Sequence, residues 1–364
     1  MNHQSHTMKS ILSACIEKNL SFAIFSYPGT TEIELIIENP TSNHHQQAGF
    51  ILRPFELSNE HPEVFIPADF HLNSGSDWTK YVVKILALPR IKKSHNAPKI
   101  HFTDKDRYLV DLEKGILSMP TLKVDKFIYS RIEKVDTTDD LDRAKLFFQV
   151  IENQKTAFVY LVNHPQSGMW MGATPETLTS WKGGTISTMS LAGTQPDLGG
   201  LPLWEQKEKE EQDYVTKYIE TCFSKNRIPY QTEETKSIKA GPVYHLQNAI
   251  SSLGKVSFIQ ALHLTQSMHP TPAICGVPLP RAKNLIRALE KHERAYYTGY
   301  LGFINPHKEV QLFVNLRCMQ ILSNYVALYL GGGITSKSVA EKEWEETVLK
   351  SQTLLNELES LSAK

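Results

Sequence analysis

The segment Leu330–Lys350, with the sequence LGGGITSKSVAEKEWEETVLK, limits most strongly what this chain can fold into. An apolar strand is predicted just before its three consecutive glycines, and a long helix is predicted after Ser338, a residue suited to a helix N-cap. Because glycine has no side chain, the backbone N–H groups of this turn are open to a ligand.

The predicted helix carries charged residues beside its apolar face. At about 100° per residue, Glu343, Glu346 and Lys350 fall on one side of the helix. Two acids and a lysine next to a glycine turn could hold a divalent metal ion and an anionic ligand. The alternative is a solvated helix with an ordinary Glu346–Lys350 ion pair.

The composition narrows the class of protein. The 364 residues include 39 basic and 39 acidic side chains, so no excess charge predicts binding to nucleic acid or to an anionic membrane. The 4 cysteines are scattered, which is typical of reduced thiols in the cytoplasm. The N-terminus does not resemble a signal peptide, and no apolar run approaches the about 18 residues of a membrane span. We therefore expect a soluble cytoplasmic protein, a monomer or alternatively a homodimer.

A second acid-bearing helix is predicted from Glu205 onward. Glu208 and Glu211 share a face with the apolar residues Val215 and Ile219. A carboxylate that continues an apolar stripe lies at the edge of the core, where it is costly unless it binds a cation. The alternative is an acidic first turn that the helix dipole favours.

A strand is predicted over Val124–Arg131, and its alternation places Lys126 on the same face as Ile128 and Ser130. Glu176 follows a proline between two short predicted strands. A lysine at the start of a strand is usually solvated, and a glutamate in a hairpin is usually on the surface. These residues alone therefore leave both interpretations open.

An arginine is predicted inside a later strand. The strand Val310–Ile321 puts Arg317 in line with Phe313 and Asn315, and an arginine among apolar neighbours needs an anion. His245 precedes another apolar run, where a single histidine is more often a core residue than a catalyst.

Nine runs in the last 240 or so residues jointly resemble the chorismate-utilising enzymes, which include isochorismate, salicylate, anthranilate and aminodeoxychorismate synthases. They occur in the order found in that family: Lys126–Arg131, Gly172–Glu176, Leu191–Thr194, the helix with Glu208 and Glu211, His245-Leu246, His269–Ala273, Arg294–Gly299, Leu316-Arg317-Cys318 and Gly331–Lys350.

The resemblance implies a reaction with water. Family members that add water carry lysine where this chain has Lys126, whereas the ammonia-using anthranilate type carries glutamine. The aminodeoxychorismate type carries lysine where this chain has Ala192. Ala273 is the residue typical of the isochorismate synthases, while salicylate-forming relatives often carry threonine there.

Asn248 departs from the family pattern. Threonine or serine is common three residues after the motif histidine, so the asparagine puts local substrate contacts in question.

The resemblance also implies the site. Lys126 would be the general base and Glu176 the general acid. Substrate-binding residues would be Gly193, Thr194, His245, Ala273, Tyr297, Arg317, Gly333 and Lys350. The expected cofactor is Mg²⁺, held by Glu208, Glu211, Glu343 and Glu346.

The implied fold is one large α+β chorismate-binding domain, with antiparallel sheets packed face to face and helices outside. We expect residues 1–110 to form a variable N-terminal part that is integrated into this fold, and residues 111–364 to form the catalytic domain. The predicted activity is that of an isochorismate synthase serving menaquinone or catecholate siderophore biosynthesis. The alternatives are a salicylate synthase, or an anthranilate-synthase-like subunit that is non-catalytic or needs a glutaminase partner.

Overall fold

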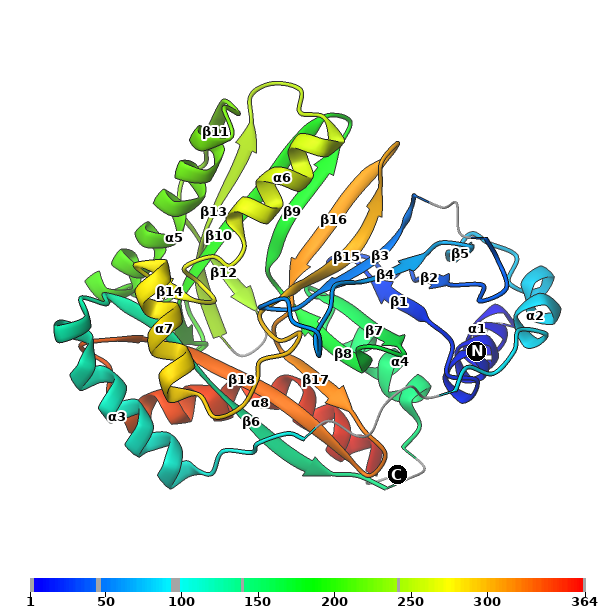
Figure 1. The fold of residues 1–364 in the computed structure, drawn as a ribbon, viewed down its shortest axis with the longest axis horizontal. Helices are drawn as coiled ribbons and strands as arrows, with labels where there is room; N and C mark the ends of the chain where they lie inside the picture. The colour runs from blue at the N-terminus through cyan, green and yellow to red at the C-terminus, as the bar shows by residue number, and fades with distance from the viewer. Residues whose placement is uncertain (1–2, 44–46, 93–98, 139–140, 241–242, 363–364) are drawn as a thin grey trace.

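Two antiparallel β-sheets occupy the centre of the molecule, and helices lie against their outer faces (Figure 1). The computed structural model describes residues 3–43, 47–92, 99–138, 141–240 and 243–362. Its helices are α1 (His3–Glu17), α2 (Thr79–Leu86), α3 (Lys105–Leu122), α4 (Arg143–Asn153), α5 (Gln206–Lys225), α6 (Phe258–Met268), α7 (Leu279–Leu289) and α8 (Ala340–Ser362).

Each sheet is built from strands that are distant in sequence. The first sheet has the order β14 (Gly276–Val277), β6 (Lys126–Asp136), β18 (Tyr325–Thr335), β17 (Cys318–Ile321), β8 (Gly168–Thr174), β7 (Phe158–His164), β1 (Phe22–Ser26), β2 (Glu34–Ile37) and β5 (Phe70–Leu72). The second has the order β11 (Tyr230–Thr232), β13 (Val243–Ser252), β10 (Thr185–Pro196), β9 (Thr177–Lys182), β16 (Glu309–Val314), β15 (Tyr300–Asn305), β3 (Gly49–Arg53) and β4 (Val64–Pro67), with β12 (Lys236–Ala240) paired to β13.

An aromatic core joins the inner faces of the two sheets. Phe158 of the first sheet stacks on Phe313 of the second, with ring centroids 4.1 Å apart and ring planes at 6°. Phe25 likewise contacts Phe50 across the sheets. Such ring pairs contribute about 0.5–1.5 kcal/mol each beyond the area that they bury. The expected fold class, antiparallel sheets packed face to face with helices outside, is confirmed.

The outer faces of the sheets are covered by the apolar sides of the helices. Helices α1, α4 and α8 share a core with the first sheet, and α5 and α6 share one with the second. Helices α3 and α7 pack with β6 around Phe127 and Tyr129. Among the helices in the described part of the chain, none combines the length and the apolar character that a membrane crossing requires.

The N-terminal strands belong to both sheets. Strand β1 pairs with β7, and β3 pairs with β15, so this part of the chain shares the same two sheets as the rest. Helix α3 runs through residue 110 without a break. The division into residues 1–110 and 111–364 stays a prediction.

The single strand predicted over Val310–Ile321 is wrong. Strand β16 ends at Val314 in the second sheet, and β17 begins at Cys318 in the first. Arg317 lies in the link with a φ of 46°, a left-handed conformation that is uncommon for a residue other than glycine. The chain changes sheets here, and the turn directs Arg317 to the pocket described below. The last helix begins at Ala340, one residue later than an N-cap at Ser338 would start it.

Candidate active site

A pocket between the two sheets collects thirteen of the fourteen predicted site residues. Its walls come from β6 and β18 of the first sheet, β10 and β13 of the second, and helices α5 and α8. The predicted residues that line it are Lys126, Glu176, Gly193, Thr194, Glu208, Glu211, His245, Ala273, Tyr297, Arg317, Gly333, Glu346 and Lys350. Glu343, the fourteenth, does not line the pocket but lies beside it.

Lys126 begins β6 and points into the pocket. Its side chain is almost completely buried, and its Nζ lies 3.8 Å from Oε2 of Glu211 on α5. Strand β18 pairs with β6 here, and a Cβ placed on Gly333 would lie 3.0 Å from Cε of Lys126. The glycine therefore leaves the room that the lysine side chain needs.

Glu176 lies in the connection between β8 and β9. Its backbone carbonyl accepts a hydrogen bond of 2.9 Å from Val314 N, which fixes the connection to β16. The residue is 4% exposed. Burial raises the pKa of Glu176 to about 8, although the nearby Lys126 ammonium opposes the rise. At neutral pH the carboxyl is mostly protonated, so it can donate a proton within the same pocket as Lys126.

The raised pKa of Glu176 predicts how activity depends on pH. Because the protonated carboxyl is the acid, kcat/KM, which reports the free enzyme, is expected to fall as the pH rises through about 8. A pH profile of kcat/KM tests this. The slow residual turnover of Glu176→Gln should lack this alkaline decline. A wild-type rate that stays constant far above this pH would contradict the assignment.

His245 and Arg317 form a hydrogen-bonded pair at one end of the pocket. His245 Nδ1 lies 2.8 Å from the carbonyl oxygen of Gly193 and 3.3 Å from Thr194 Oγ1. Arg317 Nη2 lies 3.4 Å from Nε2 of His245. Burial, followed by the charge of Arg317, lowers the pKa of His245 to about 3, so the ring is neutral. A neutral ring that donates from Nδ1 to Gly193 can accept from Arg317 through Nε2. Histidine thereby orients the guanidinium.

Gly193 brings the backbone of β10 close to helix α5. Its φ is +68°, and a Cβ at this position would lie 3.0 Å from the Cβ of Glu208. Both the left-handed backbone and this close approach favour glycine. The register of β10 with β13 shifts between Ala192 and Gln195, so a bulge turns this part of the strand toward the pocket.

Lys350 and Tyr297 contribute polar groups near the glycine turn. Lys350 Nζ donates to the Gly331 carbonyl at 3.1 Å and to Glu346 Oε1 at 2.6 Å. Burial raises the pKa of Tyr297 well above its usual range, so its hydroxyl stays protonated and can donate a hydrogen bond to an anion. A Cβ on Gly331 would lie only 2.7 Å from this hydroxyl, so the turn needs glycine there as well.

The glutamates of α8 form an acidic pair over the glycine turn. A Cβ on Gly332 would lie 3.5 Å from Oε2 of Glu343 and 3.6 Å from Oε1 of Glu346, so both carboxylates lie close to the glycine turn. Burial first, and then the charge of Glu346, raise the pKa of Glu343. Two like charges in a partly buried space favour a bound cation, and hard carboxylate oxygens suit Mg²⁺. Glu208 and Glu211 reach the same pocket from α5. The residues present therefore fit the metal.

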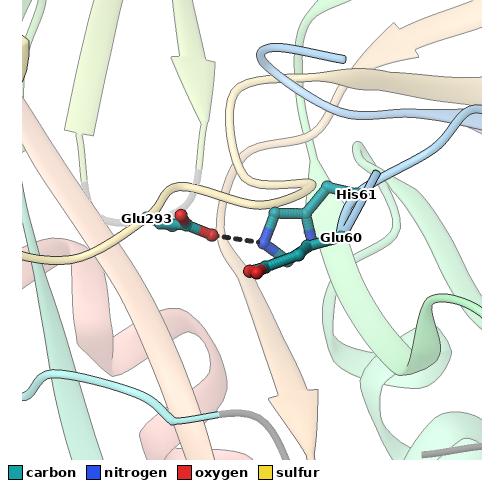
Figure 2. Close-up of side chains that lie close together, drawn as sticks. All are labelled: Glu60, His61 and Glu293. Carbon is teal, nitrogen blue, oxygen red and sulfur yellow. Dashed lines mark hydrogen bonds and ion pairs between the residues drawn. The ribbon is translucent and has the colours of Figure 1, made fainter. Parts of the chain in front are cut away.

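The four glutamates do not form a close ligand cluster. Within the described ranges, the group whose ligand atoms all lie within 4.8 Å of one another is Glu60, His61 and Glu293, and none of these lines the pocket. Figure 2 shows the His61 ring directed at Glu293, with Nε2 and Oε2 2.8 Å apart. An ordinary surface ion pair explains this contact. For the glutamates of the pocket, the wider spacing suits an ion that keeps several water ligands, as Mg²⁺ does.

Lys207 lines the pocket and was missed by the sequence analysis. It is the second residue of α5, and its Nζ lies 3.7 Å from Oε1 of Glu343 on α8. In the sequence it is one of several charges in the run EQKEKEEQ, and no pattern distinguishes it from its neighbours.

Asn248 does not line the pocket, which resolves the question of its unusual identity. Its Oδ1 accepts a hydrogen bond of 2.7 Å from Gln212 of α5, and its Nδ2 donates to the Glu233 carbonyl at 3.0 Å. Asn248 thus joins α5 to the second sheet, and its direct contacts are structural.

Comparisons with known proteins identify a family that matches most of the chain. Residues 22–359 match the model of a family described as chorismate binding enzymes. Isochorismate synthase EntC of Escherichia coli strain K12 is 29% identical over 247 residues, which is 65% of this chain and 63% of EntC. The chain thus matches just under two-thirds of the length of that relative.

Two solved structures share the fold. DhbC of Bacillus anthracis superposes with a TM-score of 0.76 at 22% identity, over 96% of this chain and 99% of the other. MenF, the menaquinone-specific isochorismate synthase of Escherichia coli, gives a TM-score of 0.74 at 19% identity, over 93% of this chain and 88% of the other. The family match spans nearly the whole described fold, including every wall of the pocket, and this chain is therefore a member of the chorismate-binding enzyme family.

Proposed function

We propose that the protein is an isochorismate synthase that converts chorismate to isochorismate with Mg²⁺ as cofactor. The observation that carries the proposal is the pairing of a buried amine with a buried, protonated carboxyl group in one pocket. Chorismate is a cyclohexadiene with two carboxylates and a hydroxyl at C4. Its isomerisation needs a base to activate water and an acid to protonate the leaving hydroxyl.

The two groups act on opposite ends of the rearranging double bonds. Lys126 takes a proton from a water molecule, whose oxygen forms a bond to C2. The double bonds shift and the C4–O bond breaks, while Glu176 gives its proton to the departing hydroxyl, which leaves as water. Lys126 ends with one proton more and Glu176 with one fewer, so a proton must return from Lys126 to Glu176, directly or through solvent, before the next cycle.

The other residues of the pocket hold the two carboxylates of the substrate. Arg317 and Tyr297, with the N–H of Gly333, bind the enolpyruvyl carboxylate, and His245 keeps the guanidinium oriented. Lys350 and the N–H of Gly193 bind the ring carboxylate. Bound Mg²⁺, held by Glu208, Glu211, Glu343 and Glu346, would supply positive charge to that same carboxylate. Thr194 and Ala273 shape the wall near the ring.

The identity of two residues favours isochorismate over other products of the family. Lys126 occupies the position where the ammonia-using enzymes carry glutamine, and Ala273 lacks the hydroxyl that salicylate-forming relatives often have. The product would feed menaquinone or catecholate siderophore biosynthesis. Incubation of the purified protein with chorismate and Mg²⁺, followed by chromatography, tests the proposal. Isochorismate supports it, whereas salicylate with pyruvate, or unchanged chorismate, overturns it.

Arg317→Ala is expected to weaken substrate binding because it removes the guanidinium from the enolpyruvyl carboxylate. Charge-assisted hydrogen bonds of this kind contribute about 1.5–3 kcal/mol, so KM should rise about 10–150-fold. Arg317→Lys should give an intermediate KM, because it keeps the charge but loses the two parallel N–H donors. Steady-state kinetics on both variants checks this order. An unchanged KM in Arg317→Ala would remove the residue from the substrate site.

A further inference from the structure

Lys207 connects the two glutamate-bearing helices across the pocket. It lies in the first turn of α5, and its ammonium reaches Glu343 on α8 over 3.7 Å. The Lys207 side chain is 32% exposed, whereas that of Glu343 is 6% exposed. The lysine can therefore leave the contact for solvent or for the pocket, while the carboxylate stays in place.

The neighbouring lysines already have partners in the same region. Lys350 pairs with Glu346 at 2.6 Å, and Lys126 lies 3.8 Å from Glu211. Each of these glutamates thus has a lysine Nζ within 4 Å, and Lys207 fills this role for Glu343.

An ammonium and a divalent cation compete for one carboxylate, because both are attracted to the same oxygens and repel each other. We propose that Lys207 is an internal competitor for the metal, which pairs with Glu343 in the free enzyme and turns to the anionic substrate when Mg²⁺ occupies that carboxylate. Lys207 lines the pocket and is half-buried, so its ammonium is within the space that the substrate enters. The inference rests on the proposed magnesium site.

The inference predicts two effects of opposite sign. Lys207→Met removes the competitor, so Mg²⁺ should bind the free enzyme more tightly, with a Kd at least about fivefold lower. The same change removes a cation from the substrate, so the Kd for chorismate at saturating Mg²⁺ should rise about tenfold. A lysine that merely ties α5 to α8 would not separate the two affinities in this way.

Isothermal titration calorimetry on the full chain measures both affinities. Mg²⁺ is titrated without substrate, and chorismate is titrated in a Glu176→Gln background, where turnover is too slow to disturb the equilibrium. Lys209→Met is the matched control, because Lys209 is exposed on the same helix and the charge change is identical. Lys209→Met should leave both constants unchanged.

A double variant makes the test specific to Glu343. In a Glu343→Gln background, Lys207→Met should no longer tighten Mg²⁺ binding, because the shared carboxylate is absent. Lys207→Gln replaces Lys207→Met if the latter lowers the melting temperature. Unchanged or weaker Mg²⁺ binding in the folded Lys207 variant would overturn the inference. Absence of Mg²⁺ binding in the wild type would instead overturn the proposed magnesium site, and the inference with it.

Discussion

Lys126→Ala and Glu176→Gln are each expected to lower kcat by about 10²–10⁴-fold, which is the usual contribution of a positioned acid or base. Lys126→Ala leaves water without its base, and Glu176→Gln cannot give a proton to the leaving hydroxyl. Both side chains lie in the pocket, so their loss should affect chemistry more than folding. Steady-state rates and thermal melting of each variant measure the two effects separately.

The double variant and a matched control complete this prediction. Acid and base act in one reaction step, so Lys126→Ala with Glu176→Gln should lose much less than the product of the single effects. Lys134→Ala is the control for Lys126, because Lys134 lies on the same strand but is exposed and pairs with Asp136. Near-normal turnover in either single variant would show that its residue is not the acid or base.

Arg294→Leu is expected to destabilise the fold by about 3–5 kcal/mol, the usual effect of breaking a buried ion pair. Arg294 is 5% exposed and donates through Nε and Nη2 to both carboxylate oxygens of Glu290, at 2.8 and 2.7 Å. It also donates to the carbonyls of Ile128 and Ile274, so it ties β6 to the segment before β14. The substitution leaves Glu290 buried with its main counter-ion gone. Denaturant unfolding of purified variants measures the loss.

Arg287→Leu supplies the comparison on the same stretch of chain. Arg287 pairs with Glu56 at 2.9 Å, but its side chain is 57% exposed. Exposed ion pairs contribute about 0–1 kcal/mol, so this variant should unfold almost like the wild type. Glu290→Gln combined with Arg294→Leu should recover part of the loss, because the uncompensated charge is then absent. Equal destabilisation by the two arginine variants would show that burial of the Arg294 pair has no special role.

The sequence correctly predicted the orientation of site residues that lie on a regular strand or helix. Strand alternation put Lys126 and Ile128 on one face of β6, and both line the pocket. Helical periodicity put Glu208 and Glu211 on one side of α5, and both line it too. The packing of the two sheets came from the family resemblance, because local patterns do not say which distant strands pair.

Arg317 shows where local patterns fail. The apolar residues on either side continue an alternation that suits one strand, yet the chain crosses from the second sheet to the first at this residue. A positive φ at an arginine is stabilised by its surroundings rather than by its own preference, so the sequence gives no sign of it. The sequence suggested that Arg317 binds an anion because its strand neighbours are apolar. In the structure Arg317 does line the pocket, but a turn places it there instead of a strand.

The contact between Lys207 and Glu343 depends on how helices α5 and α8 pack, which the sequence does not show. A charged run at a helix start is normally solvated, and only the position of α8 turns Lys207 inward to Glu343. Helical periodicity grouped Glu343 with Glu346, but only Glu346 lines the pocket, while Glu343 is buried beside it in contact with Lys207. Periodicity gives the side of a helix, whereas the contacts of each residue on that side depend on the neighbouring helix.

Isotope labelling can follow the oxygen atom on which the proposed mechanism depends. In that mechanism a water molecule activated by Lys126 adds to C2 of the ring, and the hydroxyl at C4 leaves. Chorismate and Mg²⁺ are incubated with the protein in ¹⁸O-labelled water, and the product is analysed by mass spectrometry and NMR. We expect isochorismate with one ¹⁸O atom at C2. Isochorismate without the label, or a product that carries no new oxygen at C2, would contradict it.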